Sequence, residues 1–484
     1  MNKELRRVSI VVLLMFITLF GSSTIIQVFQ QDNLKADGRN ARTLYASFSA
    51  ERGPILVGGE PIAVSVPVDD EYKYQRQYLN GPLYSAVTGY FTLNQGNTGI
   101  EGSLNDYLSG TANDQFLDQL NAIITGQNPK GAAVELTIDP AVQQAAWDAL
   151  GNQKGAVVAI DPSTGAILAM VSKPAFDPTA LATHDGAAFR AAYDSLIDDP
   201  DDPLINRTIS GDLNPPGSTF KLVVATAALE NGLTPDTEFP NPPTLTLPQS
   251  NATITNAEGG ACGGGATASI ATALRLSCNI PFAQLGLQLG YSKIAEQARE
   301  FGFGDDGIRV PMRVEPSVYP PTASDAEQML SSFGQASDRV SPLQMAMVSA
   351  AIANGGQLMK PTLVESISAP DLTELQGFSP EVYSTPMSAA TAATMTQMMV
   401  NGVSNGAASN ARINGVDVAG KTGTAENADG EPYTLWFTGF APANDPRVAV
   451  AVVVENGGGL GQSGFGNRVA APIARTVMEA VLSR

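Results

Sequence analysis

Ser218 and Lys221 are the residues whose types and spacing first suggest catalysis, and no other lysine in the chain has a serine three residues before it. They follow Pro215-Pro216-Gly217, which opposes a helix before Ser218. Apolar residues then recur at helical spacing as far as Gly232, so a helix is predicted from Ser218 to that glycine. Residues three apart share one helix face, and the positive end of the helix lies beside them. The pattern predicts a serine nucleophile with a lysine as its base.

Two later patterns fit the same chemistry. Ser277 and Asn279 form an S-x-N triplet, although Ser103-Leu104-Asn105 shows that this triplet alone is a weak signal. Lys421-Thr422-Gly423 lies in a predicted strand with glycines on either side, where a ligand can approach the backbone closely. In this order the three patterns form the serine-lysine acyltransferase set.

Charge and composition exclude several other functions. The chain has 28 basic and 47 acidic residues and a formal net charge of −19, which makes it a poor partner for nucleic acid. Its single histidine, His184, would have to serve any serine–histidine–aspartate mechanism, and we expect it in an exposed loop instead. No pair of cysteines has the spacing of a zinc site. We therefore expect no metal and no cofactor.

The two cysteines, Cys262 and Cys278, flank a glycine-rich loop. Two cysteines are too few for a disulfide scaffold, but one bridge is expected if this domain lies outside the cytoplasm. The chain-entropy model gives such a loop about 3 kcal/mol of stabilisation.

The N-terminus predicts a membrane anchor. Val8 to Phe29 is almost wholly apolar and uncharged, long enough to span roughly 30 Å of hydrocarbon as a helix. Lys3, Arg6 and Arg7 precede it, which predicts a cytoplasmic N-terminus with the rest of the chain outside. A cleaved signal peptide is the alternative, but its apolar region is shorter and no clear A-x-A site follows here. We expect an uncleaved anchor over residues 1–30.

The remainder predicts an α+β protein with two modules. Residues 31–131 alternate short β-like runs with turn-rich segments, which indicates a small module that holds the next domain away from the membrane. Residues 132–484 combine strand-like runs with a mainly helical middle, as in an antiparallel sheet between helical layers. The predicted strands are Gly155–Ile160, Ala166–Val171, Val416–Ala425, Thr434–Ala441 and Val448–Glu455, and the predicted outer helices are Pro140–Leu150, capped by Asp139, and Val469–Leu482.

Together the motifs resemble those of class B penicillin-binding proteins, the monofunctional peptidoglycan D,D-transpeptidases, and more narrowly the short actinobacterial type involved in cell division. The resemblance implies a pedestal (dimerisation-like) module and a transpeptidase domain of the penicillin-binding and serine β-lactamase fold, with a five-stranded antiparallel sheet. It extends to Arg52–Ile55, Gly99–Glu101, Tyr107 and Leu108, Gly155–Pro178, Ser332–Gln335, Ser341–Ala346, Ala353–Gly356 and Trp436–Pro442. One departure is Cys278 in the middle of S-x-N, whose side chain we expect to point away from substrate.

The resemblance implies a role for each residue of the first two motifs. Ser218 attacks the penultimate D-Ala carbonyl of a stem peptide and forms an acyl-enzyme. Lys221 accepts the serine proton only when neutral, so burial and the nearby Lys421 must lower its pKa below the ordinary ~10.4. Ser277 relays a proton to the leaving D-Ala amine, and Asn279 holds Lys221 and the substrate amide.

The third motif is expected to bind substrate. Lys421 and Thr422 recognise the substrate carboxylate, on a strand that continues through Gly423 and Thr424. The backbone N–H groups of Ser218 and Thr424 are the expected oxyanion hole.

Each residue also has an ordinary structural explanation. Ser218 alone would be a helix N-cap, Ser277 a loop residue and Lys421 a solvated strand lysine. Trp436 and Phe437 favour packing within the sheet over contact with a ligand. Glu426 is an alternative general base for hydrolysis.

The sequence thus predicts a membrane-anchored D,D-transpeptidase that cross-links peptidoglycan stem peptides on lipid II-derived glycan strands and is acylated by β-lactams. Septal wall synthesis during cell division, with a partner glycosyltransferase and other divisome proteins, is the expected setting. About a hundred residues between anchor and catalytic domain leave too little room for a glycosyltransferase domain. The alternatives are a D,D-carboxypeptidase or β-lactamase, in which water is the acceptor, and a non-enzymatic β-lactam sensor or divisome scaffold.

Overall fold

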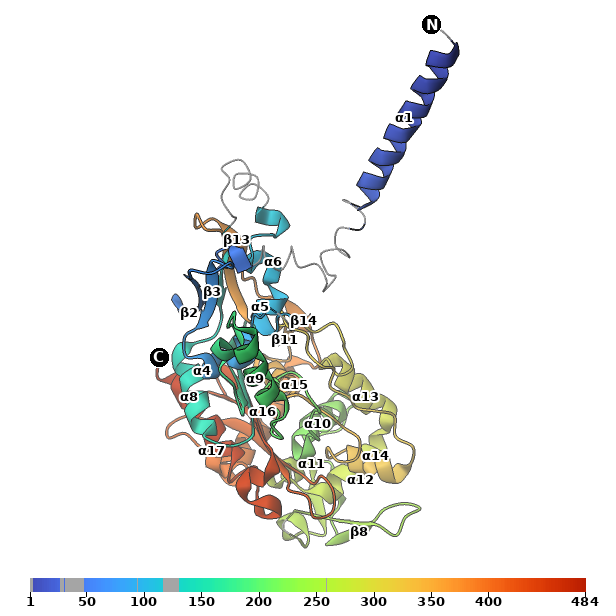
Figure 1. Cartoon of the computed structure of the whole chain (residues 1–484). Helices are drawn as coiled ribbons and strands as arrows, with labels where there is room; N and C mark the ends of the chain where they lie inside the picture. Colours follow the sequence, from blue (N-terminus) through green and yellow to red (C-terminus); the bar gives the residue numbers. More distant parts are fainter. Residues whose placement is uncertain (1–2, 27–29, 31–47, 94, 116–129, 258) are drawn as a thin grey trace.

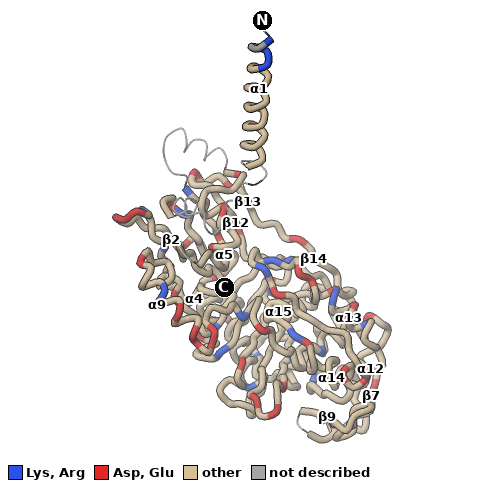
Figure 2. Tube along the Cα trace, turned by 45° about the vertical axis from the view of Figure 1, so that its right-hand side comes forward, with Lys and Arg blue, Asp and Glu red and all other residues tan. Residues whose placement is uncertain are grey.

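The structure is a computed structural model that describes residues 3–26, 30, 48–93, 95–115, 130–257 and 259–484 (Figure 1). Helix α1, Lys3–Thr24, contains a 20-residue stretch of mean hydropathy 1.8 with no side chain buried in the protein. Figure 2 shows lysine and arginine at the N-terminal end of this helix and none along the remainder. By length and composition α1 can cross a membrane, a test that a signal sequence also passes. Residues 27–29 of the predicted apolar span lie outside the described residues.

A six-stranded sheet forms the pedestal, in the order β13-β12-β4-β1-β2-β3. Only the pairing of β1 with β4 is parallel. The strands are β1 Ile55–Val57, β2 Glu60–Pro67, β3 Tyr74–Tyr78, β4 Ala133–Leu136, β12 Val364–Ser368 and β13 Glu374–Gly377. Three of them come from the segment predicted as the catalytic domain, so the sheet crosses the expected boundary between residues 131 and 132. Residues 31–47, 94 and 116–129 of the predicted 31–131 module lie outside the described residues.

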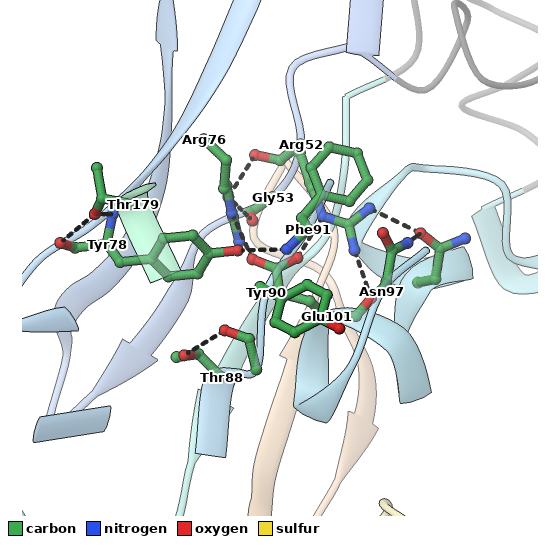
Figure 3. Close-up of polar contacts among 12 residues, drawn as sticks. Arg52, Gly53, Arg76, Tyr78, Thr88, Tyr90, Phe91, Asn97, Glu101 and Thr179 are labelled. Carbon is green, nitrogen blue, oxygen red and sulfur yellow. Dashed lines mark hydrogen bonds and ion pairs between the residues drawn. The ribbon is translucent and has the colours of Figure 1, made fainter. Parts of the chain in front are cut away.

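A buried ion triad fixes the pedestal (Figure 3). One carboxylate oxygen of Glu101 lies 2.5 Å from Arg52 Nε, and the other lies 2.6 Å from Arg76 Nε. Burial alone would raise the pKa of Glu101, but the two guanidinium groups hold it below its ordinary value. The triad joins α5, Gly99–Ser103, to the residues that precede β1 and to β3.

The second sheet has five strands in the order β15-β16-β17-β5-β6, all antiparallel. The strands are β5 Gly155–Ile160, β6 Ile167–Lys173, β15 Ala419–Ala425, β16 Thr434–Ala441 and β17 Val448–Val454. The predicted sheet is therefore confirmed, with β15 beginning three residues later than expected.

Alternating side chains of this sheet face two different cores. Val450 and Val452 of β17 belong to a cluster with α8 (Pro140–Leu150) and α17 (Ala470–Leu482). Ala451 and Val453 face the opposite cluster with α15, Pro342–Ala353. Figure 1 shows α8 and α17 together on one side of the sheet. The Asp139 carboxylate accepts the N–H of Val142 at 2.9 Å and caps α8. The predicted arrangement of a sheet between helical layers is confirmed.

The remaining helices and short strands complete the two modules. In and around the pedestal they are α4 Gly81–Thr88, α6 Asn105–Leu108, η2 Asn113–Gln115, η3 Pro178–Leu181 and α9 Gly186–Ile197. In the helical part they are η4 Gly217–Phe220, α10 Lys221–Glu230, η5 Cys262–Gly264, α11 Ile270–Leu276, α12 Asn279–Leu289, α13 Tyr291–Glu300, α14 Asp325–Ser331, α16 Ala389–Asn405, η6 Ser409–Ala411, η7 Asn456–Gly459 and η8 Gly461–Ser463. The short strands are β7 Glu238–Pro240, β8 Thr244–Thr246, β9 Thr253–Thr255, β10 Thr267–Ser269, β11 Leu358–Met359 and β14 Val382–Ser384.

Candidate active site

The nucleophile turn differs from the predicted helix start. Ser218 lies in the 3₁₀ turn η4, and α10 begins only at Lys221. The cap positions of η4 and α10 are occupied by Pro216 and Phe220, so Ser218 is the N-cap of neither. Gly217 has φ +50° and donates its N–H to Gly334 O at 2.9 Å. A Cβ at Gly217 would lie 2.9 Å from Thr424 O, so a glycine there lets the turn approach β15.

Lys221 makes three polar contacts that define the centre of the site. Its Nζ lies 2.9 Å from Ser218 Oγ, 2.8 Å from Ser277 O and 2.9 Å from Asn279 Oδ1. The two carbonyl oxygens can only accept, so they take the two N–H groups of a neutral amine. The lone pair of that amine then faces the hydroxyl of Ser218. The spacing of three residues, carried by η4 and the start of α10, thus places the predicted base beside the predicted nucleophile.

Burial favours this neutral state of Lys221. The side chain is fully buried, which lowers its pKa well below the ordinary value, and the nearby Lys421 lowers it further. Both causes are those expected from the sequence.

The loop between α11 and α12 orients Ser277 and Asn279. Ser277 ends α11 in a left-handed conformation, φ +62°, and its carbonyl points at Lys221. The amide nitrogen of Asn279 donates to Thr255 O at 3.0 Å, which directs its oxygen to Lys221. Asn256 accepts the backbone N–H groups of Asn279 at 2.9 Å and of Ile280 at 3.1 Å, and so holds the start of α12. Sequence reasoning missed Asn256, because a contact over more than twenty residues leaves no local pattern.

Lys421 forms a hydrogen bond with the side chain of Ser277. Its Nζ donates to Ser277 Oγ at 2.6 Å and to Thr422 O at 2.8 Å. Only 2% of the residue is exposed, so it is not a solvated strand lysine, and burial lowers its pKa to about 7. Ser277 therefore connects the two lysines, one through its carbonyl and the other through its hydroxyl.

The substrate-binding strand predicted from the sequence borders the nucleophile turn. Strand β15 is an edge strand of the five-stranded sheet. A Cβ at Gly423 would lie 2.9 Å from Pro216 O, which shows how closely the strand and the turn approach. Thr422 Oγ1 donates to Ala407 O at 3.0 Å, and Thr424 Oγ1 accepts the N–H of Gly466 at 3.2 Å. The sequence did not indicate that the loops containing Ala407 and Gly466 support this strand.

Cys262 and Cys278 form a disulfide with Cα atoms 5.8 Å apart. Cys278 is fully buried and lies at the N-terminal end of α12, between the two S-x-N residues that face the lysines. The bond ties the glycine-rich loop around η5 to the S-x-N segment.

Several other expectations can be compared with the structure. Trp436 and Phe437 are fully buried, and the Trp436 indole donates to Pro215 O at 2.9 Å, so packing rather than ligand contact is confirmed.

His184 is not the exposed residue expected, because its Nδ1 lies 2.6 Å from Asp70 and Tyr72 packs against its ring. Glu426 is exposed at the end of β15. Within the described ranges no three His, Cys, Asp or Glu side chains gather to hold a metal ion.

Comparison with known families identifies the class. Residues 155–479 match the penicillin-binding protein transpeptidase domain, and residues 52–134 match the penicillin-binding protein A dimerisation domain. The chain belongs to the penicillin-binding protein transpeptidase family.

Particular relatives resemble the chain over its full length. Peptidoglycan D,D-transpeptidase PbpA of Mycolicibacterium smegmatis is 43% identical over 490 residues, covering 100% of this chain and 99% of that protein. PbpA of Mycobacterium tuberculosis H37Rv is 40% identical with the same coverage. A solved structure of penicillin-binding protein A from M. tuberculosis, a ceftriaxone acyl-enzyme complex, has a TM-score of 0.87 and 39% identity, covering 90% of this chain and 100% of that one. Within the family the chain is thus similar to the PbpA type.

Proposed function

We propose that the protein is a peptidoglycan D,D-transpeptidase that works through an acyl-enzyme on Ser218. The observation that carries this proposal is the contact of a buried lysine with the hydroxyl of Ser218, the carbonyl of Ser277 and the amide of Asn279. The names of the PbpA relatives and the acyl-enzyme structure of one of them support it.

The first half-reaction follows from these contacts. Ser218 Oγ attacks the penultimate D-Ala carbonyl while its proton passes to the lone pair of Lys221. The developing oxyanion accepts hydrogen bonds from the backbone N–H groups of Ser218 and Thr424, an interaction often worth a few kcal/mol per donor. The peptide C–N bond then breaks, and the terminal D-Ala leaves as an amine after taking up a proton.

Ser277 is suited to deliver that proton. Its hydroxyl oxygen accepts a hydrogen bond from Lys421, so its own O–H remains available to donate. A proton passed from Lys221 through Ser277 to the departing amine returns Lys221 to the neutral state. In the second half-reaction the acceptor amine of another stem peptide attacks the ester and loses its proton by the same route.

Substrate selection rests on β15. Lys421 binds the carboxylate of the terminal D-Ala, Thr422 joins it when its hydroxyl turns away from Ala407 O, and the backbone of Gly423 and Thr424 lines the strand along which the peptide extends. The same carboxylate contact recruits β-lactams, whose amide carbonyl acylates Ser218. The reaction uses no metal and no cofactor.

Labelling with a fluorescent penicillin tests the acylation step. The purified ectodomain should become labelled, Ser218→Ala should not, and a Ser210→Ala control should label like the wild type. Absence of Ser218-dependent label would end the acyltransferase proposal and favour a scaffold or sensor. Label lost within seconds would favour a β-lactamase, and release of D-Ala without transfer to an added amine acceptor would favour a carboxypeptidase.

We also propose the cellular arrangement. Residues 1–30 anchor the chain with the N-terminus in the cytoplasm, residues 31–131 together with β4, β12 and β13 form the pedestal, and the rest of residues 132–484 catalyses on the outer side of the membrane. The basic flank of α1 and the disulfide support this orientation. We expect septal localisation with a partner glycosyltransferase and other divisome proteins, which fluorescence microscopy and co-purification test. Mature protein that begins near Gln30 would replace the anchor with a cleaved signal peptide.

A further inference from the structure

The segment Gly334–Ser341, here called the strap, runs beside the nucleophile turn. On one side Gly334 O accepts the N–H of Gly217, and Val340 exchanges two backbone hydrogen bonds with Asn214 at 2.9 and 3.2 Å. On the other side Arg339 exchanges two with Val318 at 2.7 and 3.1 Å. The strap therefore links the approach to Ser218 with the segment that precedes α14.

Asp338 is buried in the strap. Its residue exposure is 0%, and neither carboxylate oxygen has a hydrogen-bond partner among the residues that the structure describes. The adjacent guanidinium of Arg339 donates instead to the backbone oxygens of Ala336 at 3.2 Å and of Asp338 at 2.7 Å. Native proteins pair buried polar groups, so an unpaired buried carboxyl requires an explanation.

The electrostatic surroundings favour the protonated form of Asp338. Burial raises the pKa of its carboxyl well above the ordinary value, the charge of Arg339 opposes this, and Glu327 on α14 reinforces it. The phenol of Tyr319 also interacts with Asp338, and burial raises the pKa of that phenol to about 12, so it stays neutral. Among the described residues, Arg339 and Glu327 are the charged groups that act on the carboxyl, and Tyr319 is the titratable group that interacts with it.

Tyr319 provides a second connection to the nucleophile. Its ring stacks on Phe220, two residues after Ser218, with ring centroids 5.1 Å apart. Its hydroxyl also accepts a hydrogen bond from Gln328 of α14 at 3.1 Å. A change at Asp338 can therefore reach the nucleophile turn through the strap backbone and through this ring pair.

We propose that Asp338 is a positioning residue for Ser218, and that it holds the strap against the nucleophile turn only as a neutral carboxylic acid. Ionisation puts a charge in the core that Glu327 disfavours, while the guanidinium of Arg339 is hydrogen-bonded to backbone oxygens, so the strap must move to hydrate the carboxylate. That movement loosens the hydrogen bonds to Asn214 and Gly217 and slows acylation. The effect on acylation rests on the proposed function, whereas the protonation state does not.

Infrared spectroscopy tests the protonation state directly. The difference spectrum between wild type and Asp338→Asn at neutral pH should contain the C=O stretch of a protonated carboxylic acid. The matched control, Asp306→Asn, removes an exposed carboxyl and should lack this band. An ionised-carboxylate difference at Asp338 would overturn the proposal, and this result does not depend on whether Ser218 reacts.

The pH profile of acylation tests the positioning role. We expect the labelling rate of Asp338→Asn with fluorescent penicillin, relative to that of wild type, to rise with pH, because the amide cannot ionise whereas the wild-type carboxyl ionises as pH approaches its raised pKa. The ratio of the two rates isolates Asp338 from the lysines, which titrate in both proteins. A ratio that stays constant across pH would reduce Asp338 to a structural residue.

Thermal stability provides a second test of the protonation state of Asp338. Because the pKa of Asp338 is raised on folding, its contribution to stability is fully present below the unfolded value of ~3.9 and is lost as pH rises toward the folded value. The melting temperature of Asp338→Asn relative to wild type should therefore rise with pH above about 4. A difference that does not change with pH would contradict the buried neutral acid.

Discussion

Replacing Asn279 with aspartate tests whether Lys221 must be neutral to activate Ser218. Asn279 Oδ1 lies 2.9 Å from Lys221 Nζ, so Asn279→Asp puts a carboxylate of nearly the same shape against the amine. Two opposite charges 4 Å apart interact by about 4 kcal/mol at an effective dielectric constant of 20. This favours the ammonium form and opposes the effects of burial and of Lys421, which lower the pKa of Lys221 in the native site.

The size of the expected effect follows from this energy. Each 1.36 kcal/mol changes the ratio of charged to neutral amine about tenfold, so this ratio should rise by about a thousandfold and the acylation rate at neutral pH should fall as the neutral amine is depleted. The rate should recover as pH rises, because the neutral amine is restored. The lost hydrogen bond from Asn279 to Thr255 O adds a part that does not change with pH.

Stopped-flow measurement of acylation by fluorescent penicillin across pH separates the two effects. Asn354→Asp, which adds a carboxylate on the partly exposed end of α15, is the matched control and should keep the wild-type profile. Wild-type rates and an unchanged pH profile in Asn279→Asp would show that neutral Lys221 is not the base. A slow rate without recovery at high pH would assign the loss to geometry alone.

Three further changes address stability. Glu101→Gln leaves the buried guanidinium groups of Arg52 and Arg76 without their carboxylate and should lower the free energy of unfolding in urea by about 3–5 kcal/mol. A decrease below about 1 kcal/mol would mean that the triad does not stabilise the fold. Ala336→Gly should stabilise the protein by about 1 kcal/mol, because Ala336 has φ +66° and glycine adopts this conformation without strain, and destabilisation would contradict that reading. Lys221→Met should raise the melting temperature at neutral pH, because a lysine whose pKa is lowered on folding destabilises the fold until pH reaches its unfolded pKa of ~10.4. The gain in melting temperature should shrink as pH rises toward that value. A gain that grows with pH would contradict the direction of the pKa shift.

The local parts of the site were predictable because they depend on neighbouring residues. The turn before Ser218 and the spacing to Lys221 follow from proline, glycine and helical periodicity within eight residues. The sheet strands and the cap at Asp139 follow from apolar runs and turn chemistry in the same way. Even here the first turn proved to be 3₁₀, at a glycine that closely approaches both Thr424 and Gly334.

The parts that the sequence missed depend on distant contacts. Asn256 supports Asn279, and Gly466 supports Thr424, across loops that share no periodic pattern. Strands β12 and β13 join the pedestal sheet more than two hundred residues after β4, so composition alone could not assign them. His184 was expected to be exposed, but its partner Asp70 lies 114 residues away.

The pair of lysines at Ser277 constrains how substrate binding affects the base. With a pKa of about 7, Lys421 is partly protonated in the free site, and a bound substrate carboxylate favours its charged form. The positive charge of Lys421 lowers the pKa of Lys221 and the negative charge of the bound carboxylate raises it, so the two effects largely cancel. Its neutral state must therefore depend mainly on burial once substrate is bound, which agrees with burial being the larger cause in the free protein. We infer that water entering beside Lys221 would impair acylation more than a change at Lys421 that keeps the carboxylate bound.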